Sequence, residues 1–350
     1  MRVAVIGAGA IARRGHLPAL KKHPDVEVVA IADLNEVVAK EVAKEFDVPN
    51  YYTDYREMLL KENIDTVHVC TPTPTHYKIV ADVIKSGFHA LVEKPLAMKL
   101  KEVINLKDLA KDHDVVVGVV YNWRYFSSVI QALKRVRGGY IGRLLSLHGI
   151  GFTHFPIEWT RSTWLYHKGG VLYDFFPHLV DLLLLFAEGK PVKVIAHGGD
   201  YLPSAGFINH ASITIYLENG TIITAHTSWL MGTFMFYLFL HGTGGHIFLD
   251  VRYDTYEEIH GLPNPIDNVV TFSKNMLRVA KAVLNKSLFI GTLGNYLYLI
   301  SDFIRSIKKR RKTGLFCSID DEVRRSFVIE GALQSIERGG VPISLNDSEK

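Results

Sequence analysis

The chain has 350 residues, of which 48% are hydrophobic and 22% charged, a balance that predicts folded domains and excludes a disordered chain. Its formal net charge of +4 is too small to indicate a nucleic-acid partner. The two cysteines, Cys70 and Cys317, lie far apart in the sequence, which favours a reducing, cytoplasmic setting over a disulfide framework. At the usual size of about 150 residues per domain, this length predicts two domains.

No apolar run in the chain is long enough to predict a membrane span. The basic run Lys308–Lys312 follows an apolar stretch, and this combination is compatible with contact to a membrane surface. A buried helix that ends in solvated cations explains the same two features, and we prefer that interpretation.

A dinucleotide-binding pattern opens the chain. Met1–Ile6 predicts a buried strand, and Gly7-Ala8-Gly9-Ala10-Ile11-Ala12 follows it as a G-x-G-x-x-A motif. The first glycine permits a tight turn, and the second lets a pyrophosphate approach the backbone at the N-terminus of a helix. Pro18 is expected to break or kink that helix near Leu17. A second strand ends in Asp33, at a spacing that suits a carboxylate binding the ribose diol and repelling a 2′-phosphate. The pattern therefore predicts NAD, and disfavours NADP.

Strands and helices alternate up to about residue 121, which predicts a parallel, doubly wound sheet of the Rossmann type. Ligands of such sheets bind at the carboxyl ends of the strands. One predicted strand runs into Thr71-Pro72 and His76, and the next delivers Glu93-Lys94-Pro95. Pro95 prevents the strand from continuing, and a cis Lys94–Pro95 peptide would fix the direction of Lys94. A salt-bridged pair in a surface turn is the alternative interpretation of Glu93 and Lys94.

The pattern changes in the second part of the chain, where long antiparallel strands are predicted. The segment His210–Trp229 reads as a hairpin with Asn219-Gly220 at its turn, and a second hairpin is predicted between Phe234 and Val251. Such a sheet packs helices on one face and leaves the other for a partner. We expect the boundaries to be 1–121 for the dinucleotide-binding domain and 122–350 for the second domain.

Asp174 and His178 form the second candidate site. They are four residues apart in an apolar stretch, so on a helix they share one face. Histidine titrates near neutral pH, which suits proton transfer, although a core histidine bonded to a carboxylate explains the same pattern. No further ligand with clear spacing appears, so no metal site is predicted.

Aromatic and hydrogen-bonding side chains cluster in two places that we expect to face the substrate. Together they suit a sugar or polyol, which has an apolar face and many hydroxyls; aromatic residues that merely cover the sheet are the alternative. The candidates are Tyr121, Arg124, Trp159, Arg161 and Trp164.

Taken together, these motifs resemble those of the Gfo/Idh/MocA family of NAD(P)-dependent oxidoreductases over nearly the whole chain. Each motif alone is common, and their joint order and spacing carry the resemblance. It implies a Rossmann domain followed by an α/β domain with a large, mostly antiparallel open sheet, which usually builds homodimers or homotetramers. The matching motifs are Gly7-x-Gly9-x-x-Ala12, Asp33, Thr71-Pro72 with His76, Glu93-Lys94-Pro95, and Gly170-x-x-x-Asp174-x-x-x-His178-x-x-Asp181.

The resemblance places Lys94, Asp174 and His178 on the family's catalytic lysine, aspartate and histidine. His178 is then the expected general base, Lys94 would hydrogen-bond the reacting oxygen, and Asp174 would orient the substrate or the imidazole. Pro177 stands where many members carry glycine, so we expect it to bend the helix before His178. The cofactor contacts implied are Gly7, Gly9, Ala10, Ile11, Asp33, Thr71, Pro72, His76, Glu93 and Lys94.

The function implied is hydride transfer between NAD and a secondary alcohol or ketone of a sugar, polyol, inositol or nucleotide-sugar. Two alternatives stay open. One is a glycosidase of the same fold that retains NAD, and the other is a non-catalytic NAD-binding regulator. Retention of both Lys94 and His178 argues against the regulator.

Overall fold

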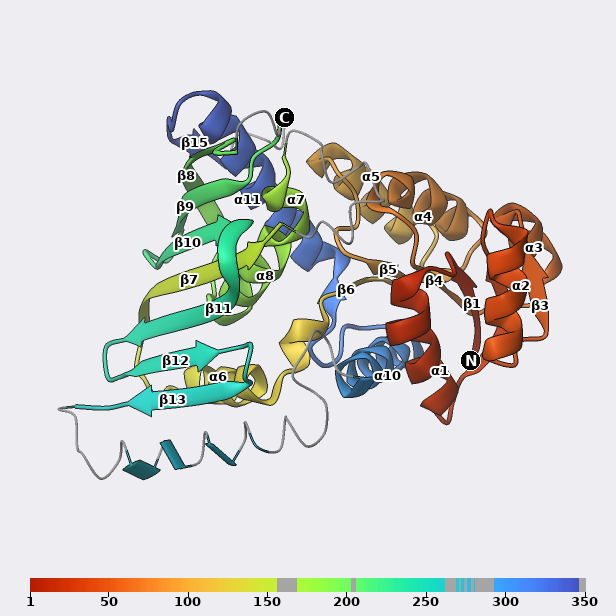
Figure 1. Cartoon of the computed structure of the whole chain (residues 1–350), viewed down its shortest axis with the longest axis horizontal. Coiled ribbons are helices and arrows are strands. Elements are labelled where there is room, and N and C mark those ends of the chain that lie inside the picture. Colours follow the sequence, from red (N-terminus) through yellow and green to blue (C-terminus); the bar gives the residue numbers. More distant parts are fainter. Residues whose placement is uncertain are drawn as a thin grey trace. The chain divides into compact units, whose positions relative to one another are not determined.

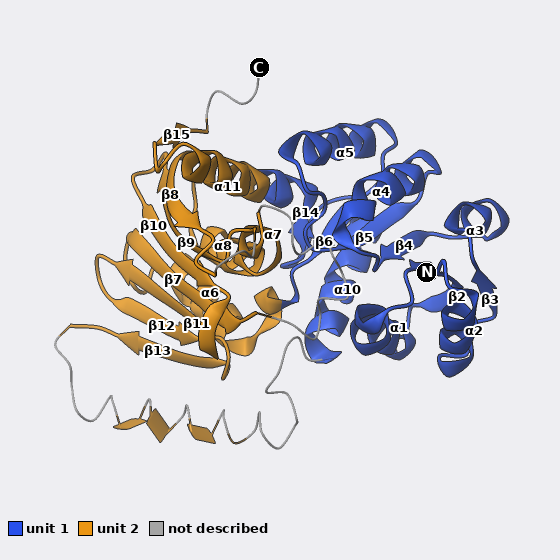
Figure 2. Ribbon diagram, turned by 45° about the horizontal axis from the view of Figure 1, so that its top comes forward, with its two compact units in different colours: residues 1–122, 291–323 blue, residues 123–290, 324–350 orange. Residues whose placement is uncertain are grey.

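The chain folds into two compact units in the computed structural model (Figures 1 and 2). The first unit comprises residues 1–122 and 291–323, and the second comprises residues 123–290 and 324–350. The structure describes residues 1–155, 169–202, 206–261, 269–270, 272–273, 276–277, 280 and 293–345.

The expected division into 1–121 and 122–350 is therefore wrong for residues 291–323, which return to the first unit. Two tertiary contacts explain the return. Helix α10 (Leu293–Lys309) packs against α1 (Leu17–Lys22), and strand β14 (Cys317–Ser318) pairs with β6 (Val117–Val120). Neither contact leaves a trace in the local pattern, because each depends on a partner about 200 or more residues away in the chain.

The first unit contains a seven-stranded sheet in the order β14-β6-β5-β4-β1-β2-β3. All its pairings are parallel except that of the edge strand β14, which confirms the predicted Rossmann-type sheet. Strands β1, β2, β4 and β6 are short and rich in β-branched residues, as buried parallel strands usually are. The remaining strands are β1 (Arg2–Ile6), β2 (Glu27–Ala32), β3 (Asn50–Tyr52), β4 (Thr66–Val69) and β5 (His89–Glu93).

The irregularity expected near Leu17 takes the form of a π-helical segment, Ala12–His16, directly before α1. Pro18 has no N–H to donate to the carbonyl four residues earlier, so a regular α-helix cannot continue through it. The wider π turn accommodates this gap, and the Leu17 N–H donates to the Ala12 carbonyl instead. The other helices of the unit are α2 (Glu36–Glu45), α3 (Tyr55–Lys61), α4 (His76–Lys85) and α5 (Leu100–Asp112).

The second unit contains an eight-stranded sheet in the order β13-β12-β11-β7-β10-β9-β8-β15. Among the strand pairs that the structure describes in this unit, only β7–β10 is parallel, so the mostly antiparallel sheet and both predicted hairpins, β9–β10 and β11–β12, are confirmed. The strands are β7 (Leu144–His154), β8 (Pro191–Gly199), β9 (His210–Leu217), β10 (Ile222–Ser228), β11 (Leu230–Gly242), β12 (His246–Asp250), β13 (Thr255–Ile259) and β15 (Ile343–Ser344).

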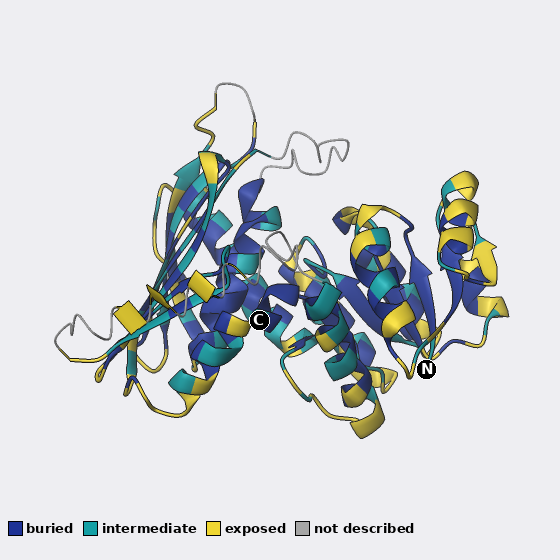
Figure 3. Cartoon of the chain, turned by 60° about the horizontal axis from the view of Figure 1, so that its bottom comes forward, coloured by how far each residue is buried: buried dark blue, intermediate teal, exposed yellow. Residues whose placement is uncertain are grey.

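Helices cover one face of this sheet. Burial alternates along β9, as expected of a strand with one packed face. Figure 3 shows the buried residues of the chain in dark blue. Gly149 and Gly151 of β7 let α8 approach closely, since a Cβ on Gly149 would lie 2.8 Å from Leu179 and Leu183. The helices of this unit whose full length the structure describes are α6 (Ser127–Arg137), α7 (Val171–Asp174), α8 (Phe176–Phe186) and most of α11 (Ile319–Glu337).

The basic run Lys308–Lys312 is largely paired with acidic side chains of its own unit. Lys308 binds Asp25 at 2.8 Å, Arg310 binds Asp114 at 2.9 Å, and Lys312 binds Asp321 at 2.5 Å. The face of α10 that precedes the run is buried, which supports the buried-helix interpretation over a membrane-surface patch. Among the helices that the structure describes, none is long and apolar enough to cross a bilayer.

Buried histidines in the first unit lead to a prediction about pH. His68 on β4 is 1% exposed, and burial together with the neighbouring His16 holds its pKa well below the usual value. The unfolded chain binds a proton at this side chain below about pH 6.5 and the native state does not, so acid favours unfolding. We expect the free energy of unfolding to fall by up to about 1.4 kcal/mol per pH unit for this group between about pH 6.5 and 5.

Urea denaturation at several pH values measures this slope. The His68→Gln variant should show a shallower slope than the wild type, whereas His113→Gln, at an exposed position, should keep it. An unchanged slope in His68→Gln would contradict the assignment.

Candidate active site

The turn after β1 contains two glycines, of which Gly7 has no room for a side chain and Gly9 does. Gly7 has a φ of +92°, and a Cβ on it would lie 2.8 Å from the Cys70 carbonyl carbon, so only glycine fits. Gly9 is exposed, with nothing within 4 Å of a Cβ placed on it, so its backbone can be approached from outside. The helical segment starts at Ala10 and Ile11 directly afterwards. This geometry fits the pyrophosphate of a dinucleotide, with Gly9 at the point of approach.

Asp33 follows β2 and lies against the same turn. Its Oδ2 accepts a hydrogen bond from the Ala8 N–H at 2.8 Å, and its Oδ1 accepts one from the Asn35 N–H at 3.0 Å. These bonds hold a partly exposed carboxylate beside the glycine turn, where the expected ribose contact would need it. The ribose contact itself stays a prediction.

His76 links two loops at the same edge of the sheet. Its Nδ1 lies 2.8 Å from the Pro95 carbonyl oxygen, and its Nε2 lies 2.8 Å from the Thr71 carbonyl oxygen. Burial lowers the pKa of His76, and the two carbonyls act in the opposite direction. Because the ring is completely buried, we expect it to serve the cofactor site indirectly, by holding Thr71 and Pro72 in place.

Strand β5 ends at Glu93, and the Lys94–Pro95 peptide is cis, as expected. The Glu93 side chain is only 13% exposed and its Oε1 lies 3.0 Å from Nε2 of His16, so the surface-turn alternative is wrong. Its Oε2 accepts the Lys94 N–H at 3.3 Å. Leu96, two residues after Lys94, donates its N–H to Oε1 of the buried Glu322 at 3.2 Å. The loop that carries Lys94 is thus bound from both sides.

The structure brings these first-unit residues to one edge. Strands β5, β4, β1 and β2 are neighbours in the sheet and run parallel, so their carboxyl ends lie side by side. Tyr121 also follows a strand of this sheet, β6, but it is 1% exposed, which leaves little surface for the predicted substrate contact.

In the second unit, Asp174 and His178 lie on either side of a helix break. Helix α7 ends at Asp174, and α8 begins at Phe176 with Pro177 in its first turn. Proline cannot donate to the carbonyl of Tyr173, which explains the break and confirms the expected bend. Both Asp174 and His178 are partly exposed, whereas most neighbours along the helix are buried.

Trp123 is a site residue that the sequence patterns did not single out. Its ring stacks on the ring of His178, with centroids 4.5 Å apart and planes 14° apart. The edges of Phe175 and Phe236 pack against the same indole. A stacked aromatic ring restricts the rotation of His178 and so supports its orientation. The signal available in the sequence was the Tyr-Asn-Trp-Arg segment after β6, in which Tyr121 and Arg124 were preferred.

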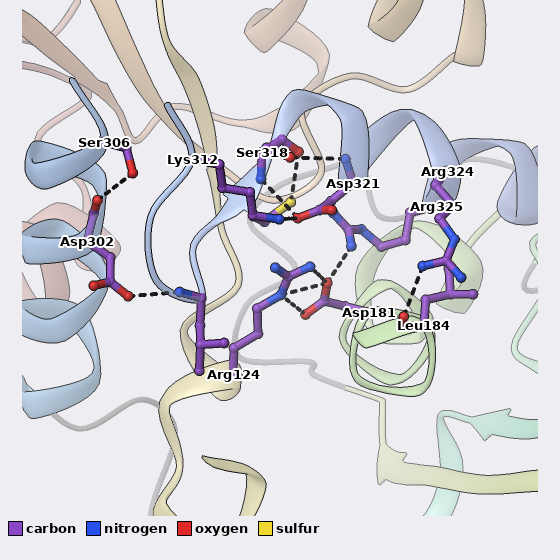
Figure 4. Close-up of polar contacts among 12 residues, drawn as sticks. Arg124, Asp181, Leu184, Asp302, Ser306, Lys312, Ser318, Asp321, Arg324 and Arg325 are labelled. Atoms are coloured by element: carbon purple, nitrogen blue, oxygen red, sulfur yellow. Dashed lines mark hydrogen bonds and ion pairs between the residues drawn. The ribbon is translucent and has the colours of Figure 1, made fainter. Parts of the chain in front are cut away.

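Arg124 was predicted to contact substrate, and the structure places it in a buried ion cluster (Figure 4). Its Nη2 lies 2.6 Å from Oδ1 of Asp181, and its Nε lies 2.9 Å from Oδ2. Arg325 of α11 binds the same Oδ1. With 3% of its side chain exposed, Arg124 holds α8 rather than presenting a free guanidinium to a ligand. A direct substrate contact is therefore not supported for this residue.

The remaining substrate candidates, Trp159, Arg161 and Trp164, lie outside the described residues. Within the described ranges, no group of three or more histidine, cysteine, aspartate or glutamate side chains is arranged to hold a metal ion.

Comparison with known proteins defines the class to which this arrangement belongs. Residues 1–121 match the family described as an oxidoreductase family with an NAD-binding Rossmann fold, and residues 129–248 match the GFO/IDH/MocA C-terminal domain. The chain therefore belongs to the GFO/IDH/MocA family of oxidoreductases, and its first domain is an NAD-binding Rossmann fold.

Several named proteins are similar to this chain. Myo-inositol 2-dehydrogenase from Thermotoga maritima is 27% identical over 228 residues, which cover 63% of this chain and 66% of that protein. D-glucoside 3-dehydrogenase from Escherichia coli is 25% identical over 251 residues, which cover 66% of this chain and 71% of that protein. A solved levoglucosan dehydrogenase in complex with NADH and levoglucosan has the same fold, with a TM-score of 0.82. It is 20% identical, and the match covers 99% of this chain and 100% of that chain.

The two glycines of the first turn allow a paired test of cofactor binding. Gly7→Ala forces a strained φ and a clash with backbone, so we expect it to destabilise the protein by about 1–3 kcal/mol. Gly9→Ala meets open space and should leave the melting temperature unchanged. A methyl group there would obstruct the approaching pyrophosphate, so we expect the Kd for NAD to rise by about 10-fold or more. Thermal unfolding and calorimetric titration measure the two effects, and unchanged NAD affinity in Gly9→Ala would contradict the assignment.

Proposed function

We propose that this protein is an NAD-dependent dehydrogenase or reductase that acts on a secondary alcohol or ketone of a sugar, polyol, inositol or nucleotide-sugar. The observation that carries the proposal is the place of Lys94, directly after β5 at the carboxyl edge of an NAD-binding Rossmann sheet. Similarity to proteins named as inositol, glucoside and levoglucosan dehydrogenases supports the class of substrate.

The division of chemical work follows from the side chains. Oxidation of a secondary alcohol removes a hydride from carbon and a proton from oxygen, and NAD, when bound, supplies the hydride acceptor. Lys94 hydrogen-bonds the reacting oxygen and stabilises the charge that develops on it. His178 accepts the hydroxyl proton as general base and returns it in the reverse reaction. Asp174 orients the substrate or the imidazole.

The choice of cofactor is assigned to Asp33. Its carboxylate binds the two ribose hydroxyls of NAD and repels the 2′-phosphate of NADP. We expect NAD to bind at least about 100-fold more tightly than NADP in the wild type, because two like charges at hydrogen-bonding distance cost several kcal/mol. In Asp33→Ser the preference should shrink by about 10-fold or more. Titration of NADH and NADPH by fluorescence measures the ratio, and tighter binding of NADPH to the wild type would contradict the role.

Lys94 provides the direct test of the proposed function. A screen of sugars, inositols and nucleotide-sugars, followed by the absorbance of the reduced nicotinamide, first identifies a substrate. Lys94→Ala should then lower kcat by about 100-fold or more while the Kd for NAD stays within about 2-fold, since the amine acts on the reacting oxygen. Lys85→Ala, at an exposed position on α4, is the matched control and should retain full turnover.

Three outcomes of that experiment would count against the proposal. Full turnover in Lys94→Ala would remove the lysine from the mechanism. Release of sugar from a glycoside without net formation of NADH would favour a glycosidase that retains its cofactor. NAD binding with no turnover on any substrate of these classes would favour a regulator.

A further inference from the structure

A cluster of three buried side chains lies at the carboxylate of Glu93, two in contact with it and the third in contact with one of these two. His16 Nε2 lies 3.0 Å from Glu93 Oε1, and the Tyr296 hydroxyl lies 3.3 Å from the same oxygen. His68 Nδ1 lies 2.9 Å from Nδ1 of His16. His16 is completely buried, and His68 and Tyr296 are 1% and 4% exposed. None of these three residues belongs to the motifs that carry the proposed function.

Four separate segments build this cluster. The π turn Ala12–His16 presents His16, and strands β4 and β5 contribute His68 and Glu93. Tyr296 comes from α10, about 200 residues further along the chain. Gly15 admits the tyrosine ring, since a Cβ at that position would lie 2.6 Å from Cζ of Tyr296. Gly15 therefore leaves room for the Tyr296 hydroxyl to reach the same oxygen as the His16 imidazole.

The chemistry of the side chains identifies the donors of the hydrogen bonds to Glu93. A carboxylate only accepts, so Tyr296 donates its hydroxyl proton and His16 donates from Nε2. Between His16 and His68, one Nδ1 donates a proton and the other accepts it, so His16 connects Glu93 to His68. Burial and the nearby His16 hold the pKa of His68 well below its usual value, which agrees with a neutral ring. Burial also raises the pKa of Tyr296, with Glu93 acting in the same direction, so the hydroxyl keeps its proton.

This arrangement is costly as mere packing. Polar side chains removed from water require partners, and apolar residues of the same volume would fill the space with less desolvation. What the cluster does accomplish is to fix one oxygen of Glu93, while the other oxygen accepts the backbone N–H of Lys94 at 3.3 Å. The orientation of the Glu93 carboxylate therefore affects the position of the Lys94 backbone.

We propose that His16, His68 and Tyr296 are positioning residues that hold the Glu93 carboxylate and, through it, set the placement of Lys94 for turnover. The inference rests on the proposed function, since it assigns these residues to the service of Lys94. Displacement of a reacting group by about 1 Å can cost up to about 100-fold in turnover, which sets the scale of the effects below.

The experiment uses Tyr296→Phe, His16→Leu and His16→Gln in the full chain with a substrate that the wild type oxidises. Tyr296→Phe keeps the ring against Gly15 and removes only the hydroxyl, and we expect kcat to fall by about 3- to 10-fold. His16→Leu should lower kcat by about 30- to 100-fold, and His16→Gln, whose amide can still donate to Glu93, should recover to within about 5-fold of the wild type. The Kd for NAD should stay within about 2-fold throughout.

Tyr55→Phe is the matched control, since Tyr55 also donates to a carboxylate, Asp82, at 2.7 Å within the same unit. It loses a comparable hydrogen bond and should keep the wild-type kcat. Unchanged kcat in Tyr296→Phe and His16→Leu would overturn the inference. So would an equal loss in His16→Gln and His16→Leu, or a loss of NAD affinity that accounts for the fall in turnover, because each outcome indicates a purely structural role.

Combination with Lys94→Ala separates this inference from the proposed function. If the cluster acts through Lys94, Tyr296→Phe should cause less than about a 2-fold further loss in the Lys94→Ala background. If the kcat losses of Tyr296→Phe and Lys94→Ala multiply in the double variant, the inference is overturned and the proposed function still stands. Full turnover in Lys94→Ala alone would overturn the proposed function and this inference with it.

Discussion

The hydrogen bonds around the loop from Glu93 to Leu96 are the constraint on which the first unit's site depends. A proline ends strand β5, so the loop cannot be held by further pairing within the sheet. Side chains hold it instead: His76 binds the Pro95 carbonyl, Glu322 binds the Leu96 N–H, and His16 binds Glu93. These partners come from the segment after β4, from α11 and from the π turn. The position of Lys94 therefore depends on how several distant segments of the unit pack together.

In the second unit, a buried cluster of charged side chains holds helix α8 in place. Asp181 lies in an apolar helix, where a lone carboxylate would be expensive, and it is bound by Arg124 and Arg325. Loss of one partner from such a buried cluster typically costs about 3–5 kcal/mol, although an apolar replacement of the whole cluster can be neutral. The cluster therefore supports a specific pairing of α8 with α11 and with the segment after Trp123. That segment also carries the indole that stacks on His178, so positioning of α8 and orientation of the proposed base are coupled within the unit.

Local patterns and tertiary contacts account for different parts of the site. The Gly7 turn, the alternating strands and the Asn219-Gly220 hairpin follow from short-range rules on φ, burial and turn geometry, and each was correctly predicted. The burial of Arg124 against Asp181 and the return of residues 291–323 to the first unit were not predicted, for one reason. An arginine and an amphipathic helix are compatible with several partners, and the choice among Asp181, α1 or a ligand depends on residues remote in the chain.

The sequence by itself determined the family and the NAD-binding fold. It also indicated the edge of the sheet at which ligands are expected to bind, and Lys94 with Asp174 and His178 as candidates for proton chemistry. It could do so because phosphate binding, strand termination and helix breaking each demand particular residues at particular spacings. Only the tertiary structure decided what surrounds these residues. The His16–Glu93–Tyr296 contacts, the bridge made by His76, and the stacking of Trp123 on His178 join segments that no spacing rule connects, because their contacts depend on how distant elements pack.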